Sequence, residues 1–136
     1  MTAPTRGRSI AAPLGVAAAA VGGLVLLHVR DPRTSTYLPC PLHALTGLWC
    51  PGCGTTRALG DLTRGDVAAA ASSNVVAVVL VVVAVGVWGL WLRARWTQKP
   101  LTLPRPNRPA AAVLVALLTV FTVVRNTPWG TSIAPT

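Results

Sequence analysis

The feature that most constrains this chain is an apolar run at residues 75–92 that contains no charged or strongly polar side chain. Within lipid every backbone amide and carbonyl must be satisfied internally, and a helix does this for each residue. A helix rises about 1.5 Å per residue, so roughly 20 apolar residues cross the hydrocarbon layer. The full segment 67–92 is longer than one crossing needs, and we expect it to tilt or to begin outside that layer. The run predicts a transmembrane helix.

Two further blocks, residues 10–29 and 109–125, are apolar over about the length of a membrane crossing. For the first block a cleaved signal peptide is the alternative, but no small-x-small cleavage site followed by a polar start is clear, so we expect an uncleaved span. Only 11% of the residues are charged, against about 25% in soluble domains, which argues against an ordinary soluble enzyme. The sequence therefore predicts an all-α, multi-pass membrane protein, a single domain with three transmembrane helices.

The net charge of +9 comes from cations that lie between the apolar blocks, which favours a topology signal over nucleic-acid binding. Seven cations fall in the N-terminal tail and the basic loop 93–108: Arg6, Arg8, Arg93, Arg95, Lys99, Arg105 and Arg108. The other five are Arg30, Arg33, Arg57, Arg64 and Arg125. The positive-inside rule then predicts a cytoplasmic N-terminus and an extracytoplasmic loop 30–66. We expect membrane lipid as a partner, with another membrane protein as a further one and no nucleic acid.

The loop 30–66 carries two short motifs with metal-ligand spacing. Cys40 and His43 form one pair at i and i+3, and Cys50 and Cys53 form a second pair after six intervening residues. A tight turn can present both side chains of such a pair to one ion, and two turns can complete a tetrahedron. The pentapeptide 50–54, Cys-Pro-Gly-Cys-Gly, resembles the metal knuckle of zinc ribbons and rubredoxins. The spacing predicts a zinc site with three cysteines and one histidine.

Two other readings of the cysteines stay open. The sequence Trp-Cys-Pro-Gly-Cys at 49–53 also looks like a thioredoxin-type motif, in which Cys50 and Cys53 cycle between dithiol and disulfide and Cys40 is a third thiol. No βαβ pattern surrounds it, which argues against that interpretation. The third reading is a structural disulfide from Cys40 to Cys50 or Cys53, with one inert thiol left over.

A short amphipathic or re-entrant helix is predicted after the cysteine-rich loop. Arg57, Asp61 and Arg64 lie at i, i+4 and i+7 and form one charged stripe, which we expect to be a solvated face with an Arg57–Asp61 pair. Arg57 is also the cation nearest in sequence to a metal–thiolate centre, so we expect it to offset the charge of that centre. Asp66 can cap the following span, and Asn74 can support the loop that carries Cys40, Cys50 and Cys53, which we call the motif loop.

The motif resembles a bacterial family of small membrane proteins classed as a domain of unknown function. The resemblance covers about 35 residues, and many members of that family have Pro after the motif's Asn, where this chain has Val75. The matching residues are Cys40, Pro41, Leu45, Thr46, Gly47, Cys50, Pro51, Gly52, Cys53, Gly54, Thr56, Arg57, Ala58, Gly65, Asp66 and Asn74. The resemblance implies a protein of the bacterial inner membrane and supplies no activity. We therefore predict a non-enzymatic, metal-stabilised interaction or assembly module, with a membrane thiol–disulfide oxidoreductase as the alternative.

Overall fold

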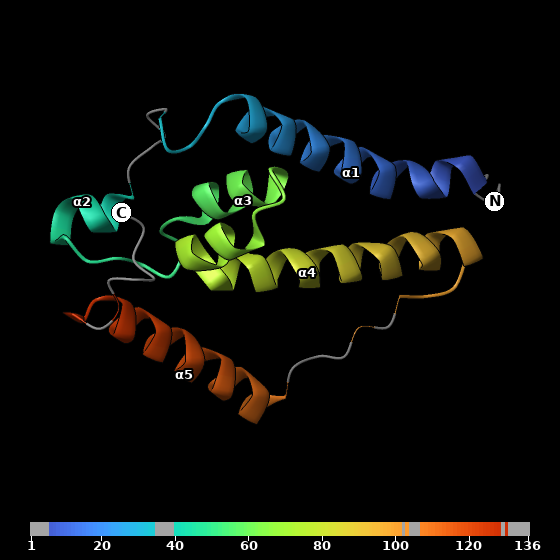
Figure 1. Ribbon diagram of the computed structural model, residues 1–136. Helices are drawn as coiled ribbons and strands as arrows, with labels where there is room; N and C mark the ends of the chain where they lie inside the picture. Colours follow the sequence, from blue (N-terminus) through green and yellow to red (C-terminus); the bar gives the residue numbers. More distant parts are fainter. Residues whose placement is uncertain (1–5, 35–39, 102, 104–106, 129, 131–136) are drawn as a thin grey trace.

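The computed structural model describes residues 6–34, 40–101, 103, 107–128 and 130, and within them the chain is helical with no strand. The helices are α1 (Arg6–Val29), α2 (Pro41–Thr46), α3 (Thr55–Thr63), α4 (Val67–Thr97) and α5 (Arg108–Arg125) (Figure 1). Three segments, Ile10–Val29, Val67–Thr97 and Arg108–Arg125, are long and apolar enough to cross a membrane. The all-α fold class with three such helices is thus confirmed. Arg105 of the predicted basic loop lies outside the described residues.

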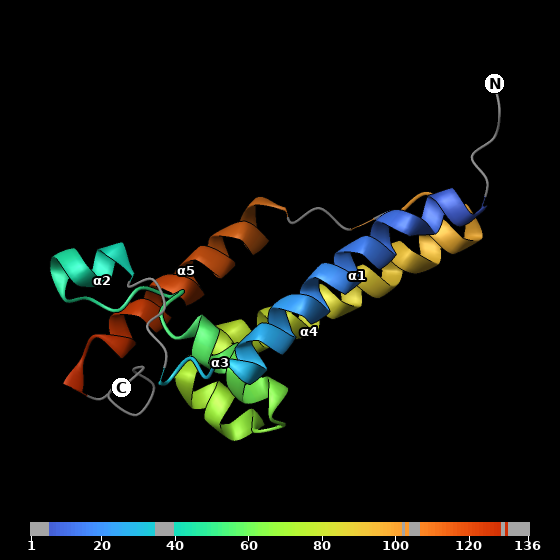
Figure 2. The same cartoon turned by 90° about the horizontal axis from the view of Figure 1, so that it is seen from above.

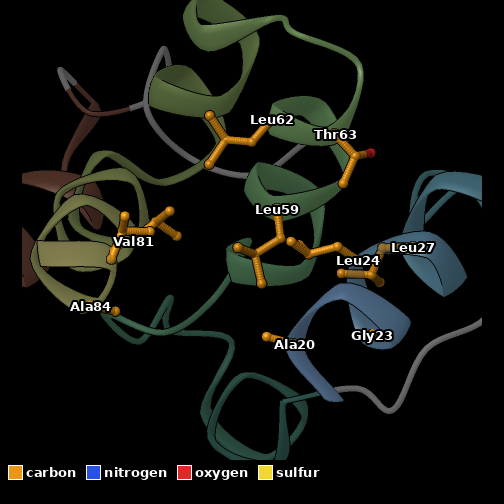
Figure 3. Close-up of a pocket in the computed structure, with 10 residues that line it drawn as sticks. Ala20, Gly23, Leu24, Leu27, Leu59, Leu62, Thr63, Val81 and Ala84 are labelled. Carbon is orange, nitrogen blue, oxygen red and sulfur yellow. The ribbon is translucent and has the colours of Figure 1, made fainter. Parts of the chain in front are cut away.

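The long helices α1 and α4 run antiparallel and side by side, and the short helix α3 packs against both (Figures 1 and 2). Leucines of α1 and α3 face the α4 side chains across an apolar cavity of about 480 Å³ (Figure 3). Helix α5 diverges from this group, and its backbone packs against no other helix in the described chain, although the side chain of its last residue, Arg125, reaches α4. The C-terminal end of α5 lies beside the motif loop, where Asn126 bonds the backbone of Trp49.

Small side chains allow α3 to fold back onto α4. Ala58 of α3 is fully buried against Ala70 and Ala77 of α4, with Leu62 packed beside them. Alanine leaves the two backbones close enough for such contact, as small residues do between helices in lipid. The predicted amphipathic helix is therefore packed against the spans through its apolar face.

The prediction that Asp61 lies on a solvated face of this helix is wrong. Its side chain is buried, and its carboxylate accepts hydrogen bonds from Arg33 at 2.8 Å and from the Ser73 hydroxyl at 3.1 Å. Arg33 lies just after α1, so the loop that follows α1 is tied to both α3 and α4 by one carboxylate. Asp61 shares a helix face with Arg57 and Arg64 as the periodicity predicted, but its bonds to Arg33 and Ser73 bury it, whereas Arg64 is exposed.

We expect the two halves of this ion pair to be unequal. The side chain of Arg33 is 45% exposed and that of Asp61 is 8% exposed. Arg33→Met strands a buried carboxylate and should cost about 2–3 kcal/mol of unfolding free energy, whereas Asp61→Asn leaves an arginine that can reach water and should cost about 1 kcal/mol. Thermal unfolding of the purified variants in detergent measures both. The double variant should be more stable than Arg33→Met alone; equal losses in the two single variants would contradict this assignment.

Helix α4 is two helical segments joined at Asn74. Asp66 caps the first segment as predicted, accepting a hydrogen bond from the Ala69 amide at 2.8 Å. Asn74 has extended backbone angles (φ −166°, ψ 97°), and its side-chain oxygen accepts from the Ala77 amide at 3.1 Å, which caps a second segment. At about 1.5 Å per residue, residues 75–97 alone extend about 35 Å, enough for one crossing. The break therefore separates a segment long enough to cross a membrane from the first turns of α4, and α3 packs against residues on both sides of it, Ala70 and Ala77.

Candidate metal centre

The structure brings the three cysteine thiols of the chain together. The Cys50 sulfur lies 2.9 Å from that of Cys53 and 3.4 Å from that of Cys40, and all three sulfurs lie within 4.8 Å of one another. Cys40 precedes α2, whereas Cys50 and Cys53 lie in the turn before α3. The three cysteines are close enough to hold one metal ion.

Proline and glycine shape the two turns. Pro41 opens α2, where its fixed φ suits the first helical turn and its missing N–H leaves no bond unmade. Gly47 ends α2 at φ 71°, and Gly54 precedes α3 at φ 83°, both in the left-handed region that a side chain disfavours. The two glycines let the chain reverse sharply on either side of the Cys50–Cys53 turn.

The disulfide considered among the sequence-based readings is not present. A disulfide requires sulfurs about 2.05 Å apart, and the closest pair here is 2.9 Å apart. All three cysteines are free thiols. The reason is geometric: the two turns converge on a common point between three sulfurs rather than pairing two of them.

His43, the predicted fourth ligand, is not part of this group. Its ring stacks on the indole of Trp49, with the ring centroids 3.8 Å apart and the planes inclined by 17°. Its Nδ1 atom is buried and has no hydrogen-bond partner among the described residues. The structure therefore gathers three of the four predicted ligands and places the histidine ring against a tryptophan.

The thiols differ in acidity because their surroundings differ. Hydrogen bonds from the His43 backbone N–H and from the Cys50 and Cys53 thiols lower the pKa of Cys40 to about 7. Burial, followed by its thiol hydrogen bonds to Cys50 and Cys40, raises the pKa of Cys53 to about 12. Cys40 therefore ionises at a lower pH than Cys53. An ion that binds all three sulfurs must displace the remaining protons.

This order of acidity predicts the order of alkylation in metal-free protein. Only the thiolate reacts, so the iodoacetamide rate at Cys40 should rise with pH through a midpoint of about 7, while Cys53 should stay slow well above neutral pH. Peptide mass spectrometry after timed labelling at several pH values measures each site. Labelling of Cys53 at neutral pH as fast as that of Cys40 would contradict the assignment.

Arg125, at the end of α5, is a buried cation beside the cluster that the sequence analysis did not single out. It is 1% exposed, its Nη2 donates to the Ser73 carbonyl at 2.7 Å, and it lies close enough to Cys50 and Cys53 for their charges to act on it. Its Nε and Nη1 have no partner among the described residues. The signal that could have found it is a single charge ending an apolar span, because such charges rarely face lipid.

Two asparagines fasten the motif backbone to the spans. The Asn74 amide donates to the carbonyls of Pro51 and Cys53 at 2.9 and 3.1 Å. Asn126, just after α5, accepts from the Trp49 amide at 2.8 Å and donates to the Trp49 carbonyl at 2.9 Å. The turn is thus held from α4 and from the end of α5. Sequence reasoning named Asn74 as a support and missed Asn126.

The comparisons with known proteins fall on this same region. The model of a family described as protein of unknown function (DUF2752) matches residues 40–88. The matched segment contains the three cysteines, α3 and the break at Asn74, but neither α1 nor α5. No curated protein and no solved structure matches the chain. Arg125 and Asn126 therefore lie outside the part of the chain that resembles this family.

The other predicted support residues lie around the centre in different roles. Arg57 is half-buried on α3, and its effect on the centre stays a prediction. Asp61 binds Arg33, and Asp66 caps α4. Three thiolates form a soft donor set that suits zinc. The buried guanidinium of Arg125 can offset the negative charge of such a centre, so the side chains present fit the ion.

Proposed function

We propose that this is a bacterial inner-membrane protein in which Cys40, Cys50 and Cys53 bind one zinc ion. The ion stabilises the motif loop against the outer ends of α4 and α5, and the loop serves as an interaction or assembly module. The observation that carries the proposal is the convergence of three sulfurs within 4.8 Å. A dithiol exchange site needs only two cysteines, whereas a metal explains why the Cys40 sulfur also lies within 3.4 Å of the Cys50 sulfur.

Charge balance supports a divalent ion. Three thiolates and one dication carry a net charge of about −1. A buried guanidinium with no counter-charge is costly, by several kcal/mol even after relaxation. Arg125, which is buried next to Cys50 and Cys53, makes the loaded centre about neutral. The guanidinium of Arg125 and the negatively charged zinc–thiolate centre are then each other's counter-charge.

The direct test is metal analysis of the full chain purified in detergent without chelators. We expect one zinc per chain, and three free thiols when the protein is denatured with a chelator and alkylated. Removing the zinc should make the loop around Cys50 more sensitive to protease, because metal binding and local folding are coupled. Metal-free protein whose intact mass shows a disulfide would overturn the proposal in favour of the oxidoreductase.

The basic loop gives the proposed orientation. Arg93 and Arg95 lie in the last turns of α4, and Lys99 follows that helix. The positive-inside rule places these cations in the cytoplasm, so the cysteines lie on the other side of the membrane. In intact cells we expect a membrane-impermeant maleimide to label Thr34→Cys but not Lys99→Cys. Peptide mass spectrometry separates these labels from any on the native cysteines. Labelling of Lys99→Cys from outside would reverse the orientation.

A further inference from the structure

Zinc in proteins is almost always four-coordinate, and this centre supplies three ligands. Among the described histidine, cysteine and acidic side chains, the group that can share one ion comprises Cys40, Cys50 and Cys53. Structural zinc sites fill all four positions with protein, whereas sites with three protein ligands keep the fourth for an outside molecule. His43 is the nearest candidate in sequence, but its ring is engaged with Trp49.

The second observation is the incomplete hydrogen bonding of Arg125. One of its nitrogens donates to the Ser73 carbonyl, while Nε and Nη1 are buried without a partner in the described part of the chain. Buried donors without acceptors are rare because each costs about 1–3 kcal/mol, and more when charged. Ser73 directly precedes Asn74, whose amide bonds the Pro51 and Cys53 carbonyls, so the guanidinium of Arg125 lies near the turn that carries Cys50 and Cys53.

The electrostatics of the site determine what that ligand is. With Arg125 included, the metal–thiolate centre is about neutral. Helix α3 begins directly after Cys53, and the second segment of α4 begins after Asn74, beside the same turn. Each helix N-terminus adds a positive potential equivalent to roughly half a charge. The surroundings of the fourth position are therefore net positive and favour a negatively charged ligand.

We propose that the metal centre keeps an exchangeable fourth position, which takes a small singly charged anion from the aqueous phase, and that Arg125 binds this anion. The inference rests on the proposed zinc site and adds a ligand class to it. The metal centre then has two roles: it stabilises the motif loop and it binds a small anion. Arg125 is then a ligand-binding residue, although it touches no cysteine directly.

Cobalt(II) substitution tests the metal site and the anion-binding position separately. Intense thiolate-to-cobalt charge-transfer absorption reports that the cysteines hold the metal, and the weaker visible bands report the fourth ligand. Titration of the cobalt protein with thiocyanate should give a saturable shift of the visible bands, whereas neutral imidazole should give none at the same concentrations. Absence of the charge-transfer bands would overturn the metal site and this inference together. Their presence with no response to thiocyanate would overturn the inference alone.

Variants assign the anion to Arg125. Arg125→Met should weaken thiocyanate binding about tenfold or more, Arg125→Lys should weaken it less, and Arg64→Met should not change it. Arg64 is a suitable control because it follows the C-terminal end of α3, away from Cys53 at the other end, and pairs with Asp31. His43→Ala should leave the visible bands of the anion-free protein unchanged. A change in those bands would identify His43 as the fourth ligand and overturn the inference. If Arg125→Met does not fold, the response of Arg125→Lys and the thiocyanate–imidazole comparison still decide.

Discussion

Replacing any one of Cys40, Cys50 and Cys53 by serine is expected to abolish zinc binding. Serine keeps its proton at neutral pH and offers a poor ligand for zinc, so two thiolates remain where three converged. Loss of an outer-shell partner already costs roughly 10–100-fold in metal affinity, and loss of a ligand should cost more than that. Zinc per chain in parallel preparations measures the effect.

The same three variants separate the proposed function from its alternative. Because metal binding contributes folding free energy, a zinc site should lose membrane abundance or thermal stability with every one of the three substitutions. An oxidoreductase should keep its abundance and lose only thiol–disulfide exchange, chiefly with Cys50→Ser and Cys53→Ser. His43→Ala is the matched control, since His43 shares the loop but not the sulfur cluster.

Asn74→Ala is expected to be the most destabilising substitution outside the cysteines. Asn74 is fully buried, and its one amide bonds the carbonyls of Pro51 and Cys53 while its oxygen caps the second segment of α4. Alanine leaves the buried Cys53 carbonyl and the half-buried Pro51 carbonyl without this donor and removes a helix cap, which together should cost about 3–4 kcal/mol. Thermal unfolding in detergent gives the stability, and zinc content should fall with it because the turn that holds Cys53 is released.

Two variants control for this effect. Ser72→Ala, two residues earlier on an exposed face, removes only a hydroxyl bonded within its own helix and should change stability by about 0.5 kcal/mol or less. Asn74→Asp keeps the oxygen that caps the helix but replaces the amide donor by a second oxygen facing two carbonyls. It should therefore destabilise as much as alanine does. A stable Asn74→Asp protein would show that the cap, not the loop contact, matters.

The fold class could be predicted from the sequence because lipid imposes a simple rule. Apolar length and the absence of charge at residues 75–92 are enough to require a helix, whatever the rest of the chain does. The cysteine cluster was also predictable, since Cys50 and Cys53 lie within one turn and Cys40 lies ten residues before. Local spacing contains that information directly.

The remaining features depend on contacts that local spacing does not record. The bond between Asn126 and Trp49 joins residues 77 positions apart, and Arg125 reaches Ser73 across 52. The sequence did not decide whether the helix bends at Asn74, because Val75 stands where many members of the resembling family have proline. The structure shows that Asn74 makes the break itself, by exchanging helical hydrogen bonds for bonds to the motif loop.

The position of α5 in the chain has a consequence for biosynthesis. Membrane proteins are inserted from the N-terminus as they are made, so the cysteines leave the ribosome long before α5 does. On the proposed topology, until α5 has crossed the bilayer the turn at Cys50 lacks both Asn126, which bonds the backbone of Trp49, and Arg125, which we propose balances the charge of the zinc centre. Zinc loading should therefore follow complete insertion, and a chain truncated before residue 108 should reach the membrane yet fail to retain the metal.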